Sequence, residues 1–557
     1  MSLIDKPKVK ILMLKGEKGD SAYQVAVNNG YAGTEEEWKD SYINAETYYN
    51  KNEVDAKLKK KVYYFDTVAL MKSSTDLVEG DLVITKGYYI ANDGGSAYYH
   101  IVSETEKYSE DLTNGLKAEL IIKESVNVKM FGAKGDGETD DLISLTNAFN
   151  NSNTIYFDKG TYNITDNITI NNKTIVGNSS IINTISQATT QEHQIIFNGT
   201  NNVRDITFKQ SNHNVALCLI RDCYNSNFDN CKFIVDNVET NGYVDLYTNN
   251  QNLNFTNCIF NCSSYKLDGS LAIGGIWIRE YYEDKTTENI HFNNCSILHN
   301  SIDECIAIWN WQGSVKDVYI DNCTIKATDT CTSPHFISLD ADNCIMNNCN
   351  IYSPSVNSNS VIKGTHWCNV NNCNIYSHNI ENNGLSSGNI IFNNCKIYND
   401  YEKFYLGVNS INKFYNCEIE CNTIVDSRNI ELYNCKITTK SENSTDKRMF
   451  NKNIIAKNTM FDVTSCKSVF ESYFADPLNV DVSNCEFNIT TGKFMIINNN
   501  ANVNNIIKLF NNYIGKGTIT AYSGYVASGY IINNISVESL PTSLTGVTIA
   551  NNTTIGG

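Results

Sequence analysis

The segment Phe292-Asn-Asn-Cys-Ser-Ile297 decides the fold, because close copies of it recur along the chain. Each copy reads apolar, any residue, Asn, Cys, any residue, apolar. The ten copies occupy residues 228–233, 255–260, 292–297, 320–325, 346–351, 370–375, 392–397, 414–419, 432–437 and 482–487. A motif that returns this often predicts a stack of similar structural units rather than one compact core.

The internal phase of the motif indicates what one unit is. Phe292 and Asn294 are two residues apart, as are Cys295 and Ile297, but the two pairs are out of phase by one residue. One strand therefore ends at Asn294 and another begins at Cys295. Asn tolerates the left-handed backbone conformation better than other non-glycine residues, so a corner there lets Phe292, Cys295 and Ile297 all point inward. Stacked corners would align the Asn side chains into a ladder.

These features predict an all-β protein, a right-handed single-stranded parallel β-helix over residues 129–500, with small helical and β modules before it. A leucine-rich repeat is the alternative, because its period and its Asn/Cys position overlap with this pattern. The L-x-x-L-x-L frame and the helical return segment of that repeat are missing. The stretches between copies are rich in Ser, Asn, Tyr and Thr instead.

Composition narrows the possible partners. The 557 residues carry a formal net charge of −17, which argues against a nucleic-acid partner because phosphate binding requires clustered cationic side chains. Charged residues make up 19% of the chain, and no run of 18 apolar residues appears, so we expect no membrane insertion. The N-terminus lacks the long apolar core of a signal peptide.

Cysteine is unusually placed. All 19 cysteines lie between Cys218 and Cys485, and an odd number without a secretion signal argues against a complete disulfide framework. We expect buried, reduced thiols. No CxxC pair is matched by a second His or Cys pair, so we expect no metal site and no cofactor.

A second motif precedes the repeats. It reads Met130-Phe-Gly-Ala-Lys-Gly-Asp-Gly-Glu-Thr-Asp-Asp141, then a helical stretch, then Ile155-Tyr-Phe-Asp-Lys-Gly-Thr-Tyr-Asn-Ile164. Its glycines permit tight turns, Thr139 or Asp140 can cap the helix, and an apolar stripe on that helix could close the open end of the stack. The stripe consists of Leu142, Leu145 and Phe149. We expect structural roles for Asp136, Asp140 and Asp141.

This motif resembles the opening of the pectate-lyase-like β-helix family, which is found in phage tailspikes and in secreted polysaccharide-degrading enzymes. Asp158 stands where that family usually has Pro. Residues 15–20 and 23–38 are similar to a short tail-protein module of phages that infect Gram-positive bacteria, and Thr34 and Glu37 form a capping box within it. The division expected is 1–62, virion attachment; 63–128, a small β neck; 129–500, the β-helix; and 501–557, further coils, a cap or a trimerisation region.

The resemblance implies a phage tailspike or receptor-binding protein located in the virion and assembled in the host cytoplasm. Its N-terminus would attach to tail or baseplate proteins, and it would form a homotrimer, assisted by a helix over about 46–62. Its partner would be a bacterial surface glycan such as capsule, exopolysaccharide or teichoic acid. Cleavage of that glycan by hydrolysis or elimination is the expected extension, and a non-enzymatic adhesin or a structural tail appendage remains the alternative.

One outward face of the longest coils concentrates aromatic and charged residues. Aligning inward residues such as Ile276 and Ile306 leaves one outward column of Tyr247, Arg279, Trp309 and Asp340, and a neighbouring one of Asp245, Trp277, Ala307 and Ser338. Aromatic rings can stack on sugars, and two carboxylates can act as acid and base or nucleophile. The candidate catalytic residues are Asp340, Glu280, Asp303, Asp245 and Arg279. The candidate substrate-binding residues are Trp277, Trp309, Trp311, Tyr247 and Asp342.

The roles within this face stay open at the level of sequence. The same residues could bind glycan without cleaving it, or pack against a neighbouring subunit. Elimination would need a base and a charge-neutralising arginine such as Arg279. His335 and His366 lie beside the face, and we expect them to be solvated or structural rather than catalytic.

Overall fold

The structure is a computed structural model of the 557-residue chain. It describes residues 22–28, 30–42, 61–185, 194–210, 217–238, 242–264, 274–300, 304–310, 312–328, 335–353, 360–377, 386–400, 404–406, 411–424, 427–440, 448–472, 477–498, 504–522 and 525–555. Within these ranges no helix is long and apolar enough to cross a membrane.

Two short helices, α1 (Ala22–Asn28) and α2 (Glu35–Tyr42), lie in the N-terminal module. The predicted capping box of α2 is present: the Thr34 backbone N–H donates to Glu37 Oε2 at 2.7 Å, and the Glu37 N–H donates to Thr34 Oγ1 at 3.2 Å. Most of the helix expected over 46–62 lies outside the described residues. Its predicted end is wrong, because Val62 begins strand β1, whose hydrogen bonds to the neck sheet require an extended backbone.

The neck contains a five-stranded sheet in the order β1-β2-β3-β5-β4. Its strands are β1 (Val62–Phe65), β2 (Leu82–Thr85), β3 (Ala97–Val102), β5 (Lys117–Leu120) and β4 (Ser109–Asp111). One face is covered by α4 (Val68–Lys72), which begins where Thr67 Oγ1 accepts from the Leu70 N–H at 3.2 Å. Met71 and Tyr99 are fully buried between helix and sheet.

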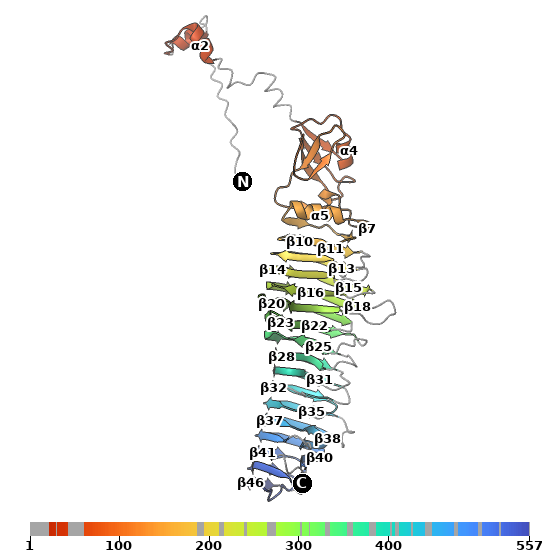
Figure 1. Ribbon diagram of the computed structural model, residues 1–557, viewed down its shortest axis with the longest axis vertical. Coiled ribbons are helices and arrows are strands. Elements are labelled where there is room, and N and C mark those ends of the chain that lie inside the picture. Colours follow the sequence, from red (N-terminus) through yellow and green to blue (C-terminus); the bar gives the residue numbers. More distant parts are fainter. Residues whose placement is uncertain are drawn as a thin grey trace.

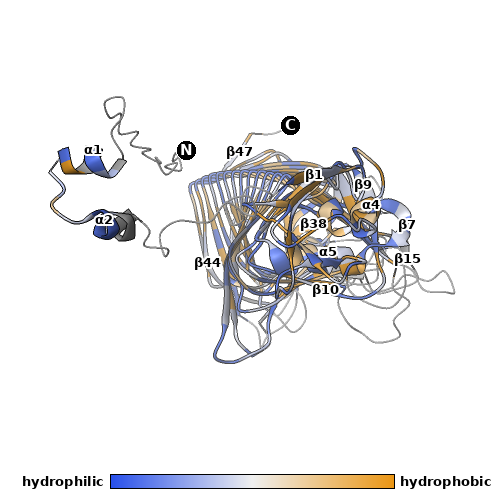
Figure 2. Cartoon of the chain, turned by 90° about the horizontal axis from the view of Figure 1, so that it is seen from above, coloured by the Kyte–Doolittle hydropathy of each residue, from blue (hydrophilic) through white to orange (hydrophobic). Residues whose placement is uncertain are grey.

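The remainder of the chain is a parallel β-helix of about 13 turns, as predicted. Its strands run from β6 (Val126–Asn127) to β47 (Thr553–Thr554) and pair in parallel from one coil to the next. Figure 1 shows these coils stacked along the long axis, and Figure 2 shows them superposed when viewed down that axis. The described part of residues 501–557, which was expected to hold further coils, a cap or a trimerisation region, therefore contains further coils. The four-part division itself stays a prediction.

The central coils contribute strands to three faces. In the central coils the first face consists of β16 (Gly242–Thr248), β19 (Gly274–Glu280), β22 (Ile306–Asn310), β25 (His335–Leu339) and the start of β28 (Ser360–Asn371). The second consists of β17 (Gln251–Thr256), β20 (Thr286–Asn293), β23 (Ser314–Asp321) and β26 (Asp342–Asn347). The third consists of β18 (Ile259–Ser264), β21 (Ser296–Asn300), β24 (Thr324–Ala327) and β27 (Asn350–Ser353).

The corner predicted from the repeat is confirmed. The asparagine of every one of the ten copies has a positive φ, between 50° and 56°: Asn230, Asn257, Asn294, Asn322, Asn348, Asn372, Asn394, Asn416, Asn434 and Asn484. Several of their amides bond to one another along the stack; for example, Asn294 Nδ2 donates to Asn257 Oδ1 at 2.7 Å, and Asn348 Nδ2 donates to Asn322 Oδ1 at 3.2 Å. The alignment of the asparagines thus follows from a backbone requirement, and it adds polar contacts at those steps where neighbouring amides bond.

The cysteines fill the interior beside these corners. Eighteen of them are described, and all of these are buried and form no disulfide, as predicted; Cys331 lies outside the described residues. Each corner thiol lies close to a backbone carbonyl of the preceding coil, as in the 3.3 Å contact from Cys258 Sγ to the Phe228 oxygen. Burial raises the pKa of Cys466 and Cys485 to about 12, so these groups are thiols at neutral pH.

The first coil is closed as the motif before the repeats predicts. Helix α5 (Leu142–Asn151) buries Leu145 and Phe149. The three glycines of the motif, Gly132, Gly135 and Gly137, all have positive φ. Asp141 accepts from the backbone N–H groups of Lys134 and Gly135 at 2.7 and 3.0 Å. Asp136 likewise accepts from the backbone N–H groups of Glu138 and Thr139, and Asp140 accepts from that of Leu142. The aspartates of this motif therefore stabilise the turns that precede the helix.

Candidate functional site

The candidate site lies on the outer surface of the first face, where β16, β19, β22 and β25 follow one another. The inward residues used for the sequence alignment are all fully buried: Val244, Leu246, Ile276, Ile278, Ile306, Ile308, Ile337 and Leu339. The strand register pairs Asp245 with Trp277, Trp277 with Ala307, Ala307 with Ser338, and Arg279 with Trp309. The predicted register is correct at these positions.

Arg279 and Asp245 form a buried bidentate ion pair. Arg279 Nε donates to Asp245 Oδ1 at 3.0 Å, and Nη2 donates to Oδ2 at 2.5 Å. The Asp245 side chain has no exposed surface and that of Arg279 is 14% exposed. The expectation that Asp245 presents a carboxylate to solvent is wrong, because the arginine of the next coil folds back over it. The charge of Arg279 is balanced by this carboxylate.

Aromatic rings pack on both sides of this arginine. The guanidinium carbon of Arg279 lies 5.0 Å from the Tyr247 ring centre and 5.1 Å from the Trp277 ring centre. The Trp277 and Trp309 rings are 5.2 Å apart. Trp277 is 8% exposed, whereas Tyr247 and Trp309 are half-buried. We call Tyr247, Trp277, Arg279 and Trp309, together with Tyr281 and Tyr282, the aromatic strip.

Tyr281 and Tyr282 are functional candidates that sequence reasoning missed. They lie in the turn between β19 and β20, are 39% and 44% exposed, and lie against Tyr247 with ring-centre distances of 5.9 and 6.5 Å. Two features of the sequence could have predicted them. The two tyrosines directly follow a strand, and the turn that contains them is longer than the turn of the neighbouring coil.

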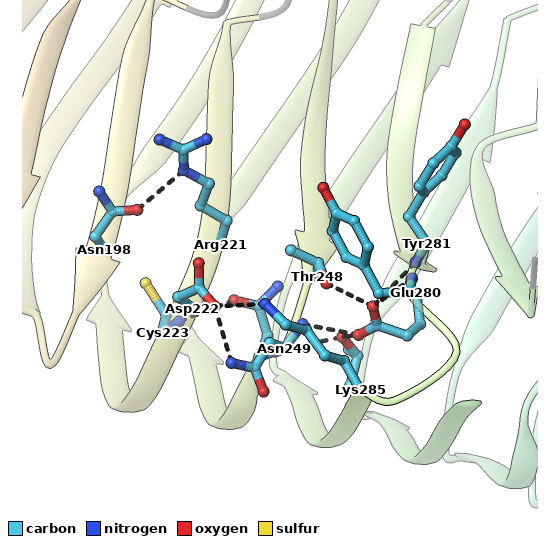
Figure 3. Close-up of polar contacts among 12 residues, drawn as sticks. Asn198, Arg221, Asp222, Cys223, Thr248, Asn249, Glu280, Tyr281 and Lys285 are labelled. Carbon is cyan, nitrogen blue, oxygen red and sulfur yellow. Dashed lines mark hydrogen bonds and ion pairs between the residues drawn. The ribbon is translucent and has the colours of Figure 1, made fainter. Parts of the chain in front are cut away.

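Glu280 holds this tyrosine turn in place (Figure 3). Its buried carboxylate accepts from the N–H groups of Tyr281 and Tyr282 at 3.0 and 3.1 Å and from the Asn249 N–H at 2.8 Å. It also accepts from the hydroxyls of Thr248 and Thr287. With five donors around it and no exposed surface, the Glu280 carboxylate does not face solvent, contrary to the sequence expectation.

An acidic side chain, Asp222, and a basic side chain, Lys285, lie beside the tyrosine turn, and both are labelled in Figure 3. Asp222 Oδ1 accepts from Asn249 Nδ2 at 2.8 Å and lies 3.5 Å from Lys285 Nζ. The Lys285 ammonium also lies 5.2 Å from the centre of the Tyr282 ring. Both side chains are partly exposed, so this end of the strip offers hydrogen-bond donors and acceptors beside aromatic surface.

The other end of the strip carries Asp340, Asp342 and His366. Asp340 directly follows Leu339, which pairs with Ile308, so it lies one rung beyond Trp309. His366 Nδ1 is 3.4 Å from Asp340 Oδ1, and His366 Nε2 is 3.6 Å from Asp342 Oδ1. The side chains of Asp340, His366 and Asp342 are 26%, 49% and 61% exposed.

The remaining residues singled out in the sequence analysis are not described by the structure, or their side chains are not. Asp303 and Trp311 are not among the described residues, and the side chain of His335 is not described either. In the described part of the chain, no group of three or more His, Cys, Asp or Glu side chains is arranged to hold a metal ion.

Part of the β-helix is similar to a known protein family. Residues 125–353 match the family described as rhamnogalacturonase A/epimerase, pectate lyase-like. The match covers less than half of the 557-residue chain. The resemblance expected from the motif before the repeats is thereby confirmed. The matched segment contains the aromatic strip and both aspartates at its end, while His366 lies beyond it.

Several solved structures are similar in fold. A capsular polysaccharide depolymerase tailspike from Acinetobacter baumannii bacteriophage Fri1 is 12% identical with a TM-score of 0.35, over 86% of this chain and 76% of that one. The tailspike of Acinetobacter phage vB_ApiP_P1 is 14% identical with a TM-score of 0.43, over 72% and 70%. The surface adhesin PfbA of Streptococcus pneumoniae is 10% identical with a TM-score of 0.29, over 76% and 93%. None of the curated proteins matches the sequence. At these scores the likeness carries no functional argument.

Proposed function

We propose that this β-helix protein recognises a bacterial surface polysaccharide along the aromatic strip and depolymerises it. The observation that carries the proposal is the stack of Tyr247, Arg279, Trp277 and Trp309, extended by two exposed tyrosines. Flat apolar rings beside hydroxyl, carboxylate and ammonium groups match the chemistry of sugars, which combine C–H faces with a rim of hydroxyls.

The charge distribution favours a sugar that is uncharged where it meets the strip. Arg279 is the cation at the centre of the strip, and its ion pair with buried Asp245 leaves little net charge. The whole chain carries −17, which disfavours a strongly anionic polymer through long-range repulsion. For the same reason Arg279 fits poorly as the charge-neutralising residue of an elimination reaction. We assign Arg279 a positioning role, because it holds two rings apart at a fixed spacing.

The wider role follows from the resemblance of the N-terminal module and of the motif before the repeats. We propose a phage tailspike or receptor-binding protein in the virion, attached through residues 1–62 to tail or baseplate proteins and assembled as a homotrimer. Light scattering tests the last point: the mass should be three times the 62.5 kDa of one chain. A mass of 62.5 kDa would overturn the trimer without affecting the glycan site.

A non-enzymatic adhesin is the second candidate. Two of the carboxylates that sequence reasoning offered for catalysis, Asp245 and Glu280, are buried and bonded within the protein. A strip without an accessible acid and base would bind without cleaving. Asp340 and Asp342 are partly exposed, and the two candidate functions therefore differ in what these residues do.

The test compares two variants that each remove one half-exposed aromatic ring. Trp309→Ala lies in the strip, and Tyr398→Ala, whose ring is 40% exposed, lies on the third face in strand β31 (Lys396–Asn399). Binding is measured by calorimetry against purified capsule, exopolysaccharide and teichoic acid from Gram-positive bacteria. Trp309→Ala should weaken binding at least about fivefold, corresponding to an aromatic contact of about 1 kcal/mol, and Tyr398→Ala should not. Equal affinities in the two variants contradict the proposed site.

A further inference from the structure

We propose that His366 joins Asp340 and Asp342 in a proton-transfer centre at the end of the aromatic strip, and that the protein cleaves its glycan there by hydrolysis. The inference rests on the proposed function, because it assumes that the glycan lies along the strip. It assigns a role to a histidine that sequence reasoning treated as solvated or structural.

The fold brings His366 to this place from the next coil. In strand β28, Gly364 pairs with Leu339, so the residues after Gly364 run beside those after Leu339. The two nitrogens of one imidazole ring thereby approach two different carboxylates, Nδ1 toward Asp340 at 3.4 Å and Nε2 toward Asp342 at 3.6 Å. A ring with one nitrogen near each carboxylate can accept a proton from one side and return it to the other.

Three of the other carboxylates around the strip, those of Asp245, Glu280 and Asp222, are held by structural contacts. Asp245 is buried against Arg279, and Glu280 is buried within the tyrosine turn. Asp222 is 45% exposed, but its Oδ1 is bonded to Asn249 and close to Lys285. Asp340 and Asp342 combine exposure with a neighbouring group that can exchange protons, which distinguishes them from these three.

The two aspartates differ in a way that separates their roles. Asp340 is the less exposed of the two, at 26%, and lies one rung beyond Trp309, where the bound chain would leave the aromatic surface. Asp342 is 61% exposed and faces the solvent that supplies water. The imidazole lies between the two carboxyl groups, so a proton taken up by one of them can be passed on to the other.

The reaction can then be written in full. The Asp340 carboxyl donates its proton to the glycosidic oxygen as the bond between that oxygen and the anomeric carbon breaks. A water molecule forms the new bond to the anomeric carbon and gives its proton to the Asp342 carboxylate. His366 accepts that proton through Nε2 and returns a proton to Asp340 through Nδ1. Proton exchange with solvent water then moves the remaining N–H of the imidazole from Nε2 back to Nδ1, which restores the starting state. One water is consumed, and no oxidant, reductant or metal is needed.

The experiment measures turnover and binding separately on the full chain. Release of reducing ends is followed with the polysaccharide that binds best, while ultraviolet absorbance reports any unsaturated product. His366→Asn should lower kcat by about 10²-fold or more with KM within about twofold, and Asp340→Asn should do the same. His291→Asn is the matched control, since that ring stacks on Tyr319 on the second face at 4.6 Å, and it should keep normal turnover.

A rescue experiment separates a chemical role from a structural one. His366→Gly should recover part of its turnover in added imidazole, because the small base can enter the gap between the two carboxyls, and Asp340→Asn should not. The acidic limb of the pH–rate profile should also move in His366→Asn.

Each outcome has a distinct meaning. Normal turnover in His366→Asn, or an ultraviolet-absorbing unsaturated product, overturns the proposal. Glycan binding by the wild-type protein without any product overturns it as well, and leaves the proposed binding function standing as an adhesin. Equal binding by Trp309→Ala and Tyr398→Ala shows instead that the strip itself was wrongly chosen.

Discussion

Replacing one corner asparagine tests the physical basis of the whole stack. Asn416 has a φ of 54°. Its Nδ2 donates to Asn394 Oδ1 at 3.1 Å, and its Oδ1 accepts from Asn434 Nδ2 at 3.1 Å. We consider Asn416→Ala and Asn416→Gly. Both variants lose the two ladder bonds, but only alanine must hold a side chain in the left-handed region.

The size of each effect follows from these contacts. The two exposed hydrogen bonds contribute roughly 0.5 kcal/mol each, so both variants should lose about 1 kcal/mol from this source. The left-handed conformation adds about 1–2 kcal/mol for alanine, while glycine adds about 0.5–1 kcal/mol for its greater freedom in the unfolded chain. Asn416→Ala should therefore cost about 2–3 kcal/mol, more than Asn416→Gly.

The assay is urea unfolding followed by intrinsic fluorescence, with amide hydrogen exchange of the neighbouring coils as a local readout. Asn374 is the matched control: it begins β29 (Asn374–Ser377) and bonds through Nδ2 to Asn350 Oδ1 at 2.8 Å, but it is not among the residues with positive φ. There alanine should be more stable than glycine. The reasoning is refuted if alanine is also the more stable replacement at position 416.

The remaining predictions concern thiols, a buried charge and pH. Native protein should resist alkylation at buried thiols such as Cys466 and Cys485, and denatured protein should take label at them; rapid native labelling would contradict the ladder. Asp245→Asn should lower the free energy of unfolding by about 3 kcal/mol or more, because it leaves the Arg279 charge largely buried without a counter-ion; a wild-type urea midpoint would argue against the ion pair. The backbone N–H groups around Asp136 lower the pKa of its carboxyl to about 2. The Asp136 carboxylate stabilises the fold above about pH 4, and this contribution should disappear as the pH falls toward about 2. The stability of Asp136→Asn should therefore depend less steeply on pH in this range than that of the wild type. Acid titrations followed by circular dichroism measure this difference.

The sequence predicted the features that depend on local pattern. The change of phase at Asn294 located the corner, because only one backbone geometry lets Phe292 and Cys295 both point inward. The alternation of inward residues gave the register between Arg279 and Trp309, because paired strands of adjacent coils keep the same period. Both inferences needed only neighbouring residues.

Features that depend on how side chains fold back against other coils could not be predicted from such local patterns. The burial of Asp245 results from the conformation of Arg279, 34 residues later, and the role of Glu280 results from the path of the turn after it. The contact between His366 and Asp340 was within reach, since extending the inward alignment by one coil, from Ile337 to Ile362, brings the two segments side by side. The distances from the carboxylates to the ring nitrogens depend on side-chain conformations that the strand register does not determine.

A structure of the protein with a bound oligosaccharide, made by soaking fragments of the best-binding polysaccharide into crystals of the Asp340→Asn variant, tests the central claim most directly. Density for sugar rings should run along the aromatic strip, against Tyr281, Tyr282 and Trp309, and a glycosidic oxygen should lie within hydrogen-bond distance of residue 340. Sugar bound instead along the asparagine-lined groove near His291 and Asn293 on the second face, with the strip empty, would contradict the account.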